Sequence, residues 1–469
     1  MRILYVLLLI VLLRTFGHAL RTIRWRFRVP TPILGWMVGL SYFVLAPLTI
    51  LTLNGGFRFP DAYGLNGNWW DIDFSKPRFL FPFVVIWISL MLTCAVVYLF
   101  GSAPGSKQDS EYDISYGRLE RVLRITMVLS VLDWILTIWL LGGMAEFLVS
   151  HWYTRAMPLI DRYGSVYILY MRLSLVNQIL FTSAAALHAC EGLKRRNTQW
   201  AFTFLILLFL VLETVMTGNR IFFALYLLAF LTSCWLYGRK KILATALVAS
   251  PLIILVFSVW GSVRQDVSAI SDSVDTYVIN ADMGNRAVTS LMDVTEGAAV
   301  MLLMNITNDY GNKYEYLYGA TYSRLFTFLE PRILHPERTP DFQTITASTY
   351  EPGEVTTLGS TALGEAWANF GVLGIFVLPL FTWFALRFSE RLTAAGNRPT
   401  LLSAVSFVMF IWFARATFAE TSMSLIGSAL LIWALRLEKG LCVRTAIDNT
   451  LVPAGPLRVF RLAPADPSA

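Results

Sequence analysis

Cysteine and histidine are both rare in this chain. Among 469 residues there are four of each, and they form no cluster with the spacing of a zinc site. The cysteines are far apart, so the sequence indicates no disulfide framework either. We therefore expect no cofactor and no metal held by soft ligands, although carboxylates can still bind a hard cation.

Charged residues are also few. They make up 15% of the chain, whereas hydrophobic residues make up 56% and the mean hydropathy is +0.58. Soluble domains carry about 25% charged and roughly 45–50% apolar residues. This composition excludes an ordinary soluble domain and predicts an integral membrane protein.

Long apolar runs are what the chain has in abundance. A helix of about 20 apolar residues crosses the hydrocarbon core of a bilayer. The runs of that length are 33–53, 79–101, 122–141, 166–189, 200–217, 220–237, 242–260, 366–386, 400–417 and 422–437. A further run at 3–20 lacks the cleavage site of a signal peptide, so we read it as a retained helix, with a re-entrant or interfacial helix as the alternative. The predicted fold is an all-α integral membrane protein with about eleven transmembrane helices.

Lysine and arginine collect in loops on one side of the proposed membrane. If the spans alternate, the basic stretches that share a side are 21–28, 107–124, 193–196, 238–241, 387–398 and the tail after Arg436. The positive-inside rule assigns that side to the cytoplasm. The net charge of +7 follows from this arrangement, so no nucleic-acid partner is needed to explain it. The partner that the charge pattern predicts is the bilayer itself.

One loop on the opposite side is large enough to be a small domain. It spans 261–356 and carries more acidic than basic residues. It separates an N-terminal transmembrane bundle (1–260) from C-terminal transmembrane helices (357–437), which a cytoplasmic tail follows (438–469). We therefore expect a large extracytoplasmic loop between two groups of spans.

Three stretches of this loop have readable patterns. Apolar residues at helical spacing predict one amphipathic helix over 287–305. Prolines interrupt a helical pattern over 319–342, and the Thr-, Ser- and Gly-rich stretch 344–360 is typical of a loop.

Single arginines at the ends of apolar runs are the first candidate functional residues. The stretch 216–223, MTGNRIFF, places Arg220 in a tight turn at the outer membrane surface, where a charge costs less than at the bilayer centre. Arg220 either snorkels to water or binds an anionic headgroup. Arg415 raises the same question, with Glu420 as a nearby structural partner, and Arg264 is either an interfacial anchor or a further cation.

Three motifs resemble one family of membrane enzymes. The loop segment GATYSRLFTFLEPRILHPERT (319–339) and the segment STALGEAWANFGVLGIFVLPLF (360–381) are similar to segments of the O-antigen polymerases, which join oligosaccharide repeat units. The turn TGNR is similar to the Gly-x-Arg turn of that family. Two positions depart from the family pattern: Arg338 stands where lysine is more common, and Asn219 where serine is usual.

The resemblance implies a function and a location. It implies polymerisation of repeat units carried on undecaprenyl diphosphate, which serves as donor and acceptor, into a surface or exopolysaccharide. The glycosyl transfer would occur at the periplasmic face of the bacterial inner membrane and would need no metal. Family members commonly work beside a chain-length regulator and a flippase, which the resemblance therefore implies as partners.

The implied chemistry assigns roles to particular residues. Departure of a lipid diphosphate needs positive charge, and arginine binds phosphate oxygens with two N–H groups. The candidates for this role are Arg220, Arg264, Arg332, Arg338 and Arg415. A general base must take the proton of the acceptor hydroxyl, and Glu365 and His335 are the candidates. A carboxylate at the position of Glu365 is either paired with a helix end or catalytic.

Other functions stay open at this point. An O-antigen ligase uses the same donor with another acceptor. A polyprenyl-phosphate-dependent glycosyltransferase would use Asp71 and Asp73 of the loop 54–78, although NWWDIDF also reads as an aromatic interfacial belt. A flippase for lipid-linked sugars is the alternative that is not an enzyme, but the two halves of the chain show no repeat of the kind that transporters carry.

Overall fold

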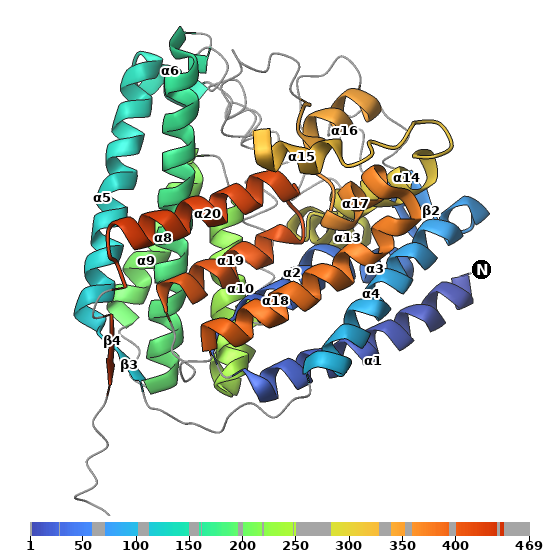
Figure 1. Ribbon diagram of the computed structural model, residues 1–469, viewed down its shortest axis with the longest axis horizontal. Coiled ribbons are helices and arrows are strands. Elements are labelled where there is room, and N and C mark those ends of the chain that lie inside the picture. Colours follow the sequence, from blue (N-terminus) through green and yellow to red (C-terminus); the bar gives the residue numbers. More distant parts are fainter. Residues whose placement is uncertain are drawn as a thin grey trace, which may run out of the picture.

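The computed structural model is nearly all helix in the parts that it describes (Figure 1). The described residues are 2–27, 29–58, 71–101, 112–149, 159–160, 162–195, 200–217, 220–246, 248–249, 283–327, 339–351, 359–393, 400–438 and 441–444. The helices of the first half are α1 (Arg2–Arg26), α2 (Pro32–Leu40), the π-helix η1 (Ser41–Leu45), α3 (Ala46–Asn54), the 3₁₀ turn η4 (Pro77–Phe79), α4 (Leu80–Gly101), α5 (Tyr116–Leu141), α6 (Met144–Val149), α8 (Ser165–Arg195), α9 (Trp200–Thr217) and α10 (Ile221–Leu236).

The second half continues the helical architecture. Its helices are α13 (Met283–Val294), α14 (Gly297–Asp309), α15 (Ala320–Thr327), α16 (Phe342–Tyr350), α17 (Ala362–Phe370), the 3₁₀ helix η6 (Gly371–Phe376), α18 (Val377–Thr393), α19 (Leu401–Phe413) and α20 (Phe418–Ala434). Two small antiparallel sheets complete the fold: β1 (Gly56–Arg58) pairs with β2 (Asp71–Asp73), and β3 (Tyr112–Ile114) pairs with β4 (Cys442–Arg444). The predicted all-α fold class is confirmed.

Most of the predicted spans are present as apolar helices. Within the described residues, six helical segments are long and apolar enough to cross a membrane: Arg2–Arg26, Pro32–Asn54, Pro77–Gly101, Tyr116–Leu141, Val166–Lys194 and Ala362–Thr393. Shorter apolar helices cover Ala201–Thr214, Ile221–Leu236, Leu401–Phe413 and Phe418–Ala434. Most of the predicted span 242–260 lies outside the described residues. The chain is thus a multi-pass membrane protein, and the count of about eleven helices stays a prediction.

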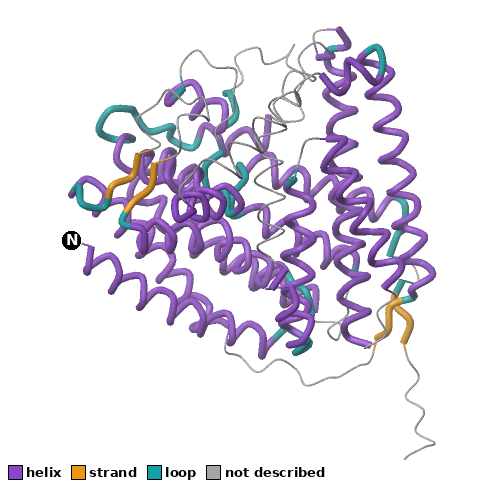
Figure 2. The backbone as a smooth tube through the Cα atoms, turned by 180° about the vertical axis from the view of Figure 1, so that it is seen from behind, coloured by secondary structure: helices purple, strands orange, loops and turns teal. Residues whose placement is uncertain are grey.

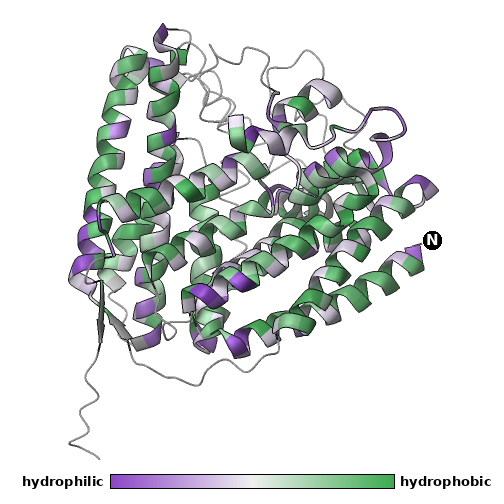
Figure 3. Cartoon of the chain, viewed as in Figure 1, coloured by the Kyte–Doolittle hydropathy of each residue, from purple (hydrophilic) through white to green (hydrophobic). Residues whose placement is uncertain are grey.

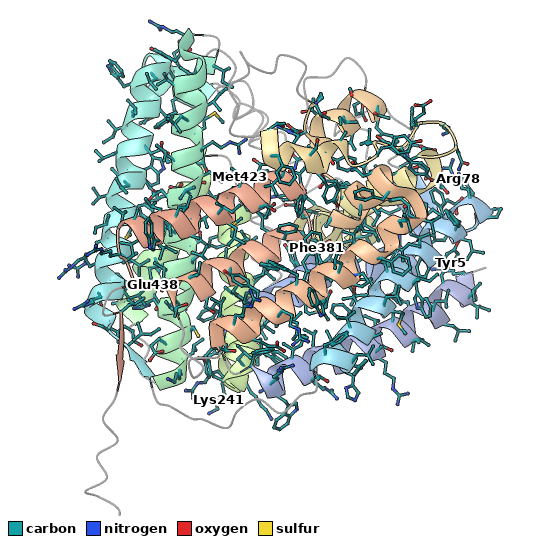
Figure 4. The ribbon with its side chains drawn as sticks, in the orientation of Figure 1. Tyr5, Arg78, Lys241, Phe381, Met423 and Glu438 are labelled. Atoms are coloured by element: carbon teal, nitrogen blue, oxygen red, sulfur yellow. The ribbon has the colours of Figure 1, made fainter. Side chains whose placement is uncertain are left out.

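Helix ends that were predicted to face the cytoplasm lie together. Arg26 at the end of α1 donates to the Phe100 carbonyl at 2.7 Å and to Glu390 at 2.6 Å, near the ends of α4 and α18. The sheets β1–β2 and β3–β4 lie at opposite ends of the bundle (Figure 2). Lys241 and Glu438 likewise lie toward the lower left in Figure 4, and Arg78 lies at the upper right. These contacts agree with alternating spans.

The first helix runs beside α4 along most of its length. Tyr5 packs edge-on against Phe83 with ring centroids 4.9 Å apart, and the Trp87 indole donates to the Leu8 carbonyl at 2.9 Å. Further along, the Tyr98 hydroxyl donates to the Thr15 carbonyl at 3.1 Å. Residue numbers rise together in both helices, so α1 runs parallel to α4 through the same depth. This packing favours a spanning helix over an interfacial one.

Apolar side chains cover the outward surface of the bundle. On α5 the exposed residues include Ile125, Leu132, Ile135 and Trp139, and the outer helices are mostly coloured hydrophobic in Figure 3. A soluble protein does not expose continuous apolar faces of this extent, whereas lipid tails cover them without cost. The surface therefore agrees with a bilayer as the solvent.

A close helix crossing holds the centre of the molecule. On α2, a Cβ atom added to Gly35 would lie 2.1 Å from the Phe407 carbonyl oxygen of α19, and one added to Gly39 would lie 2.4 Å from that of Ile411. Small residues four apart let two membrane helices approach until their backbones touch. The crossing fixes α19, and with it the turn that follows Phe413.

Two predictions of local structure differ from the structure. The stretch 287–305 is split into α13 and α14, because the chain turns sharply between them. Part of the predicted loop 344–360 is helical, since Asp341 caps α16 by accepting from the Thr344 amide at 2.8 Å. The predicted span 366–386 lies within the apolar helical segment Ala362–Thr393, in which the 3₁₀ helix η6 replaces α-helical geometry and Gly371 has a φ of +56°.

Candidate functional site at the outer helix ends

Arg220 forms a bidentate ion pair with Asp293 of the segment 261–356. It precedes α10, where the helix dipole disfavours a cation, and its side chain reaches Asp293 of α13. Nη1 lies 2.8 Å from Oδ2, Nη2 lies 2.7 Å from Oδ1, and Nη2 also lies 3.2 Å from the Asp293 carbonyl oxygen. Both side chains are mostly buried. Asp293 therefore balances the positive charge of this guanidinium and sets its direction.

Arg415 reaches the same part of the loop from another span. It lies in the turn between α19 and α20 and pairs with Glu296. Its guanidinium passes Gly359, where an added Cβ would lie 3.5 Å from Nη2. Glu296 has a φ of +54°, in the left-handed region that costs a non-glycine residue about 1 kcal/mol. Glu296 thus meets Arg415 from a left-handed backbone conformation.

We call residues 292–297, the turn between α13 and α14, the α13–α14 elbow. A third span also contacts the elbow: the Tyr42 hydroxyl of η1 donates to the Val294 carbonyl. Arg220, Asp293 and Arg415 all act electrostatically on that hydroxyl. Two of the five arginines predicted from the sequence are therefore brought to one elbow, although they are far apart in the chain.

The partner expected for Arg415 was wrong. Glu420 pairs instead with Arg172 of α8 at 2.7 Å, because it lies in the first turn of α20 on the side that faces α8. Arg415 precedes α20 and points toward the elbow. Sequence reasoning also missed Asp293 and Glu296, since the stretch MDVTEG reads as part of an amphipathic helix.

Glu365 is buried in α17 and both of its carboxylate oxygens accept hydrogen bonds. Oε1 accepts from the Thr321 hydroxyl at 2.7 Å, and Oε2 accepts from the Phe418 amide at 2.8 Å, at the start of α20. Asn369 supports this arrangement by donating to the Thr321 hydroxyl oxygen at 2.8 Å. Glu365 thus connects the loop helix α15 with α17 and α20, and its role as a base stays a prediction.

A further arginine lies close to Glu365. Arg324 of α15 lies 3.4 Å from Asp341 and acts electrostatically on Glu365. Arg324 lies in the stretch GATYSRLF, which resembles the O-antigen polymerases, but it was not among the predicted site residues. The other predicted site residues, Arg264, Arg332, His335 and Arg338, lie outside the described residues.

The carboxylates of the competing glycosyltransferase hypothesis lie in β2. Lys76 lies 3.6 Å from Asp71 and 3.8 Å from Asp73. Hydrogen bonds from Ser75, with the charge of Lys76, hold the pKa of Asp73 below its ordinary value. A lowered pKa makes a carboxylate a weaker proton acceptor, so Asp73 is poorly suited to be a general base.

Metal ligands are sparse in the part of the chain that the structure describes. No three His, Cys, Asp or Glu side chains are grouped there as a metal site would require. Cys94, Cys190 and Cys234 are buried free thiols. In this region the positive charge of the site comes from arginine.

A comparison with protein families decides the identity of the chain. The family model for the O-antigen polysaccharide polymerase Wzy matches residues 41–438. The chain belongs to this family. The match includes Tyr42, the elbow and both arginines. Searches of curated proteins and of solved structures gave no match.

Family membership confirms the resemblance seen in the sequence. Wzy polymerases are multi-pass membrane enzymes of the glycosyltransferase type that polymerise lipid-linked O-antigen repeat units. The arginine–carboxylate contacts at the α13–α14 elbow are therefore part of a polymerase that acts on lipid-linked substrates.

Proposed function

We propose that this Wzy polymerase joins oligosaccharide repeat units carried on undecaprenyl diphosphate, at the periplasmic face of the bacterial inner membrane, to make a surface or exopolysaccharide. The observation that carries the proposal is that Arg220 and Arg415, from different spans, reach one elbow at the predicted outer helix ends. The growing chain would be transferred to the non-reducing end of a new lipid-linked unit.

The two arginines suit the leaving group of this reaction. In each transfer, the bond between the anomeric carbon of the donor and a diphosphate oxygen breaks, and a bond to an acceptor hydroxyl oxygen forms. Negative charge develops on the departing lipid diphosphate, and a guanidinium binds its oxygens with two N–H groups. A well-placed donor of this kind contributes about 3 kcal/mol to the transition state. Arg264, Arg332 and Arg338 are further candidates for the same role.

The depth of the site suits a lipid-linked substrate. The diphosphate of a polyprenyl lipid sits at the headgroup level, with its chain in the hydrocarbon. Arg220 immediately precedes α10 and Arg415 lies just beyond α19, so both are at helix ends. A charge at this level costs less than the roughly 2.5–3.5 kcal/mol of the bilayer centre.

The acceptor hydroxyl must lose a proton to a base, and we keep Glu365 and His335 as the candidates. Both oxygens of Glu365 already accept hydrogen bonds. To act as a base, Glu365 would therefore have to exchange one of these bonds for the acceptor hydroxyl. We also propose that the reaction is metal-independent, because guanidinium groups supply the charge that metal ions supply in other transferases. A chain-length regulator and a flippase are the expected partners.

The test is the surface polysaccharide of a strain that lacks this chain. Polysaccharide reduced to single repeat units, and restored to full length by the wild-type chain, is the expected result. Long polymer that is not attached to its acceptor would identify a ligase instead. Repeat units that accumulate on the cytoplasmic face would identify a flippase, and either of these two results would overturn the proposal.

A further inference from the structure

The α13–α14 elbow is attached to three different spans. Tyr42 of η1 donates to the Val294 carbonyl, Arg220 donates to Asp293, and Arg415 pairs with Glu296. All three contacts fall on consecutive or nearly consecutive residues of one short turn. Side chains from the beginning, the middle and the end of the chain therefore all bind the elbow.

We propose that Asp293 and Glu296 are positioning residues of the polymerase, which set the directions of the Arg220 and Arg415 guanidinium groups toward the lipid diphosphate. This inference rests on the proposed function, because it gives the two arginines the leaving-group role. Neither carboxylate touches the reacting atoms. Each acts through the arginine that it binds.

The contact between Asp293 and Arg220 is of the kind that orients a side chain. Both carboxylate oxygens meet separate guanidinium nitrogens, at 2.8 and 2.7 Å. This arrangement fixes the plane of the guanidinium as well as its position. A guanidinium carries five N–H donors, and the contacts with Asp293 engage its Nη1 and Nη2 groups, so a lipid diphosphate would share this guanidinium with Asp293.

The elbow has a backbone that favours this arrangement. Glu296 takes a left-handed conformation with a φ of +54°, and Gly297 follows it with no Cβ. An added Cβ at Gly297 would lie 2.4 Å from the Met292 methyl group and 3.1 Å from the Met292 carbonyl oxygen. Strained conformations of this kind persist where the surroundings hold them, and they concentrate at functional sites.

A second arginine–carboxylate pair in the same chain gives a matched control. Arg172 of α8 lies 2.7 Å from Glu420 of α20. This pair also joins two helices at the predicted outer side, but its side chains are more exposed than those of Arg220 and Asp293. Its ion pair joins α8 to α20 and not to the elbow. Removing its carboxylate makes the same change in charge without affecting the proposed positioning.

The experiment compares Asp293→Asn, Glu296→Gln and the control Glu420→Gln with the wild-type chain. Each full-length protein is purified in lipid nanodiscs, and binding of farnesyl diphosphate, a short polyprenyl diphosphate, is measured per folded protein. Polymer length is measured in the deletion strain. We expect Asp293→Asn and Glu296→Gln each to lower the affinity for farnesyl diphosphate by about 10- to 100-fold. We also expect both variants to shorten the polymer. The control should match the wild type in both.

A charge swap separates positioning from simple stabilisation. Arg220→Asp combined with Asp293→Arg restores an ion pair between α10 and α13, but moves the cation to the other helix. We expect the swap to recover the melting temperature and not the affinity or the polymer length. If the swap binds and polymerises like the wild type, the pair is only structural and the inference fails. The swap also decides the question if Asp293→Asn does not fold.

One more variant separates the positioning role of the elbow from the proposed binding of the diphosphate by Arg220. If Arg220→Ala binds farnesyl diphosphate as the wild type does, the diphosphate site itself is wrong. If Arg220→Ala loses binding while Asp293→Asn and Glu296→Gln keep it, the arginine has its proposed role and only the positioning by the elbow is refuted.

Discussion

Replacing Arg220 by lysine keeps the charge at the start of α10 and removes the planar fork that Asp293 holds. The arginine meets both oxygens of Asp293, at 2.8 and 2.7 Å, and the Asp293 carbonyl at 3.2 Å. A lysine ammonium is a compact point charge that binds one oxygen at a time well. The substitution therefore removes at least one charged hydrogen bond from a mostly buried pair.

The expected effect can be estimated from that bond. Hydrogen bonds to charged groups contribute about 1.5–3 kcal/mol. If the same fork contacts the departing diphosphate, a loss of this size in the transition state slows polymerisation by about ten- to a hundredfold. A kinetic loss of that size should shift the polysaccharide toward short chains.

The assay is the chain-length distribution in the deletion strain, with each variant expressed at the level of the wild type. Membrane insertion and the melting temperature of the purified protein show whether the variant is folded. Arg172→Lys is the control, since Arg172 also pairs with a carboxylate, with its Nη1 2.7 Å from Oε1 of Glu420, and that ion pair joins α8 to α20 rather than to the elbow. Wild-type chain lengths from Arg220→Lys would refute the reasoning and leave Arg220 as an ordinary helix-end arginine.

Three further predictions test other parts of the structure. Gly35→Ala should lower the melting temperature by forcing α2 away from the Phe407 carbonyl, at a cost of about 1–3 kcal/mol, whereas Gly17→Ala, with no neighbouring atom within 4 Å, should not. Glu365→Ala should destabilise the fold by about 1–3 kcal/mol, since it leaves the Phe418 amide without its acceptor. Glu365→Gln should fold but lose polymerisation. Normal polymer from Glu365→Gln would show that Glu365 is not the general base. Purified protein should polymerise in excess chelator, and a loss that Mg²⁺ restores would disprove metal independence.

Most of the apolar spans could be predicted because they depend on local properties of the chain, whereas the alternation of the spans stays a prediction. A run of about 20 apolar residues has few alternatives to a membrane helix, and the basic loops then fix which ends lie together. Arg26, Phe100 and Glu390 meet as this reasoning requires. The position of Arg220 at a helix boundary followed from the same reasoning.

The partners of the arginines could not be predicted, because the contacts are long-range. Asp293 is 73 residues from Arg220 along the chain, and no pattern in the sequence connects them. Glu420 was preferred for Arg415 only because it was near in sequence. The glycines of α2, in contrast, left a signal: Gly35 and Gly39 have the spacing of a close helix crossing, but that spacing does not say which helix crosses.

The break between α13 and α14 explains how one turn can serve two arginines. In a continuous helix, as the pattern of 287–305 predicted, residues 293 and 296 would share a face and place two carboxylates beside each other. The left-handed conformation of Glu296 ends that regularity. Asp293 then meets Arg220, just before α10, and Glu296 meets Arg415, in the turn between α19 and α20. The apolar residues of 287–305 have helical spacing in the sequence, although the backbone leaves the helix at Glu296. A helix pattern read from the sequence therefore cannot reveal the elbow, and it is the elbow that lets the two carboxylates reach different arginines.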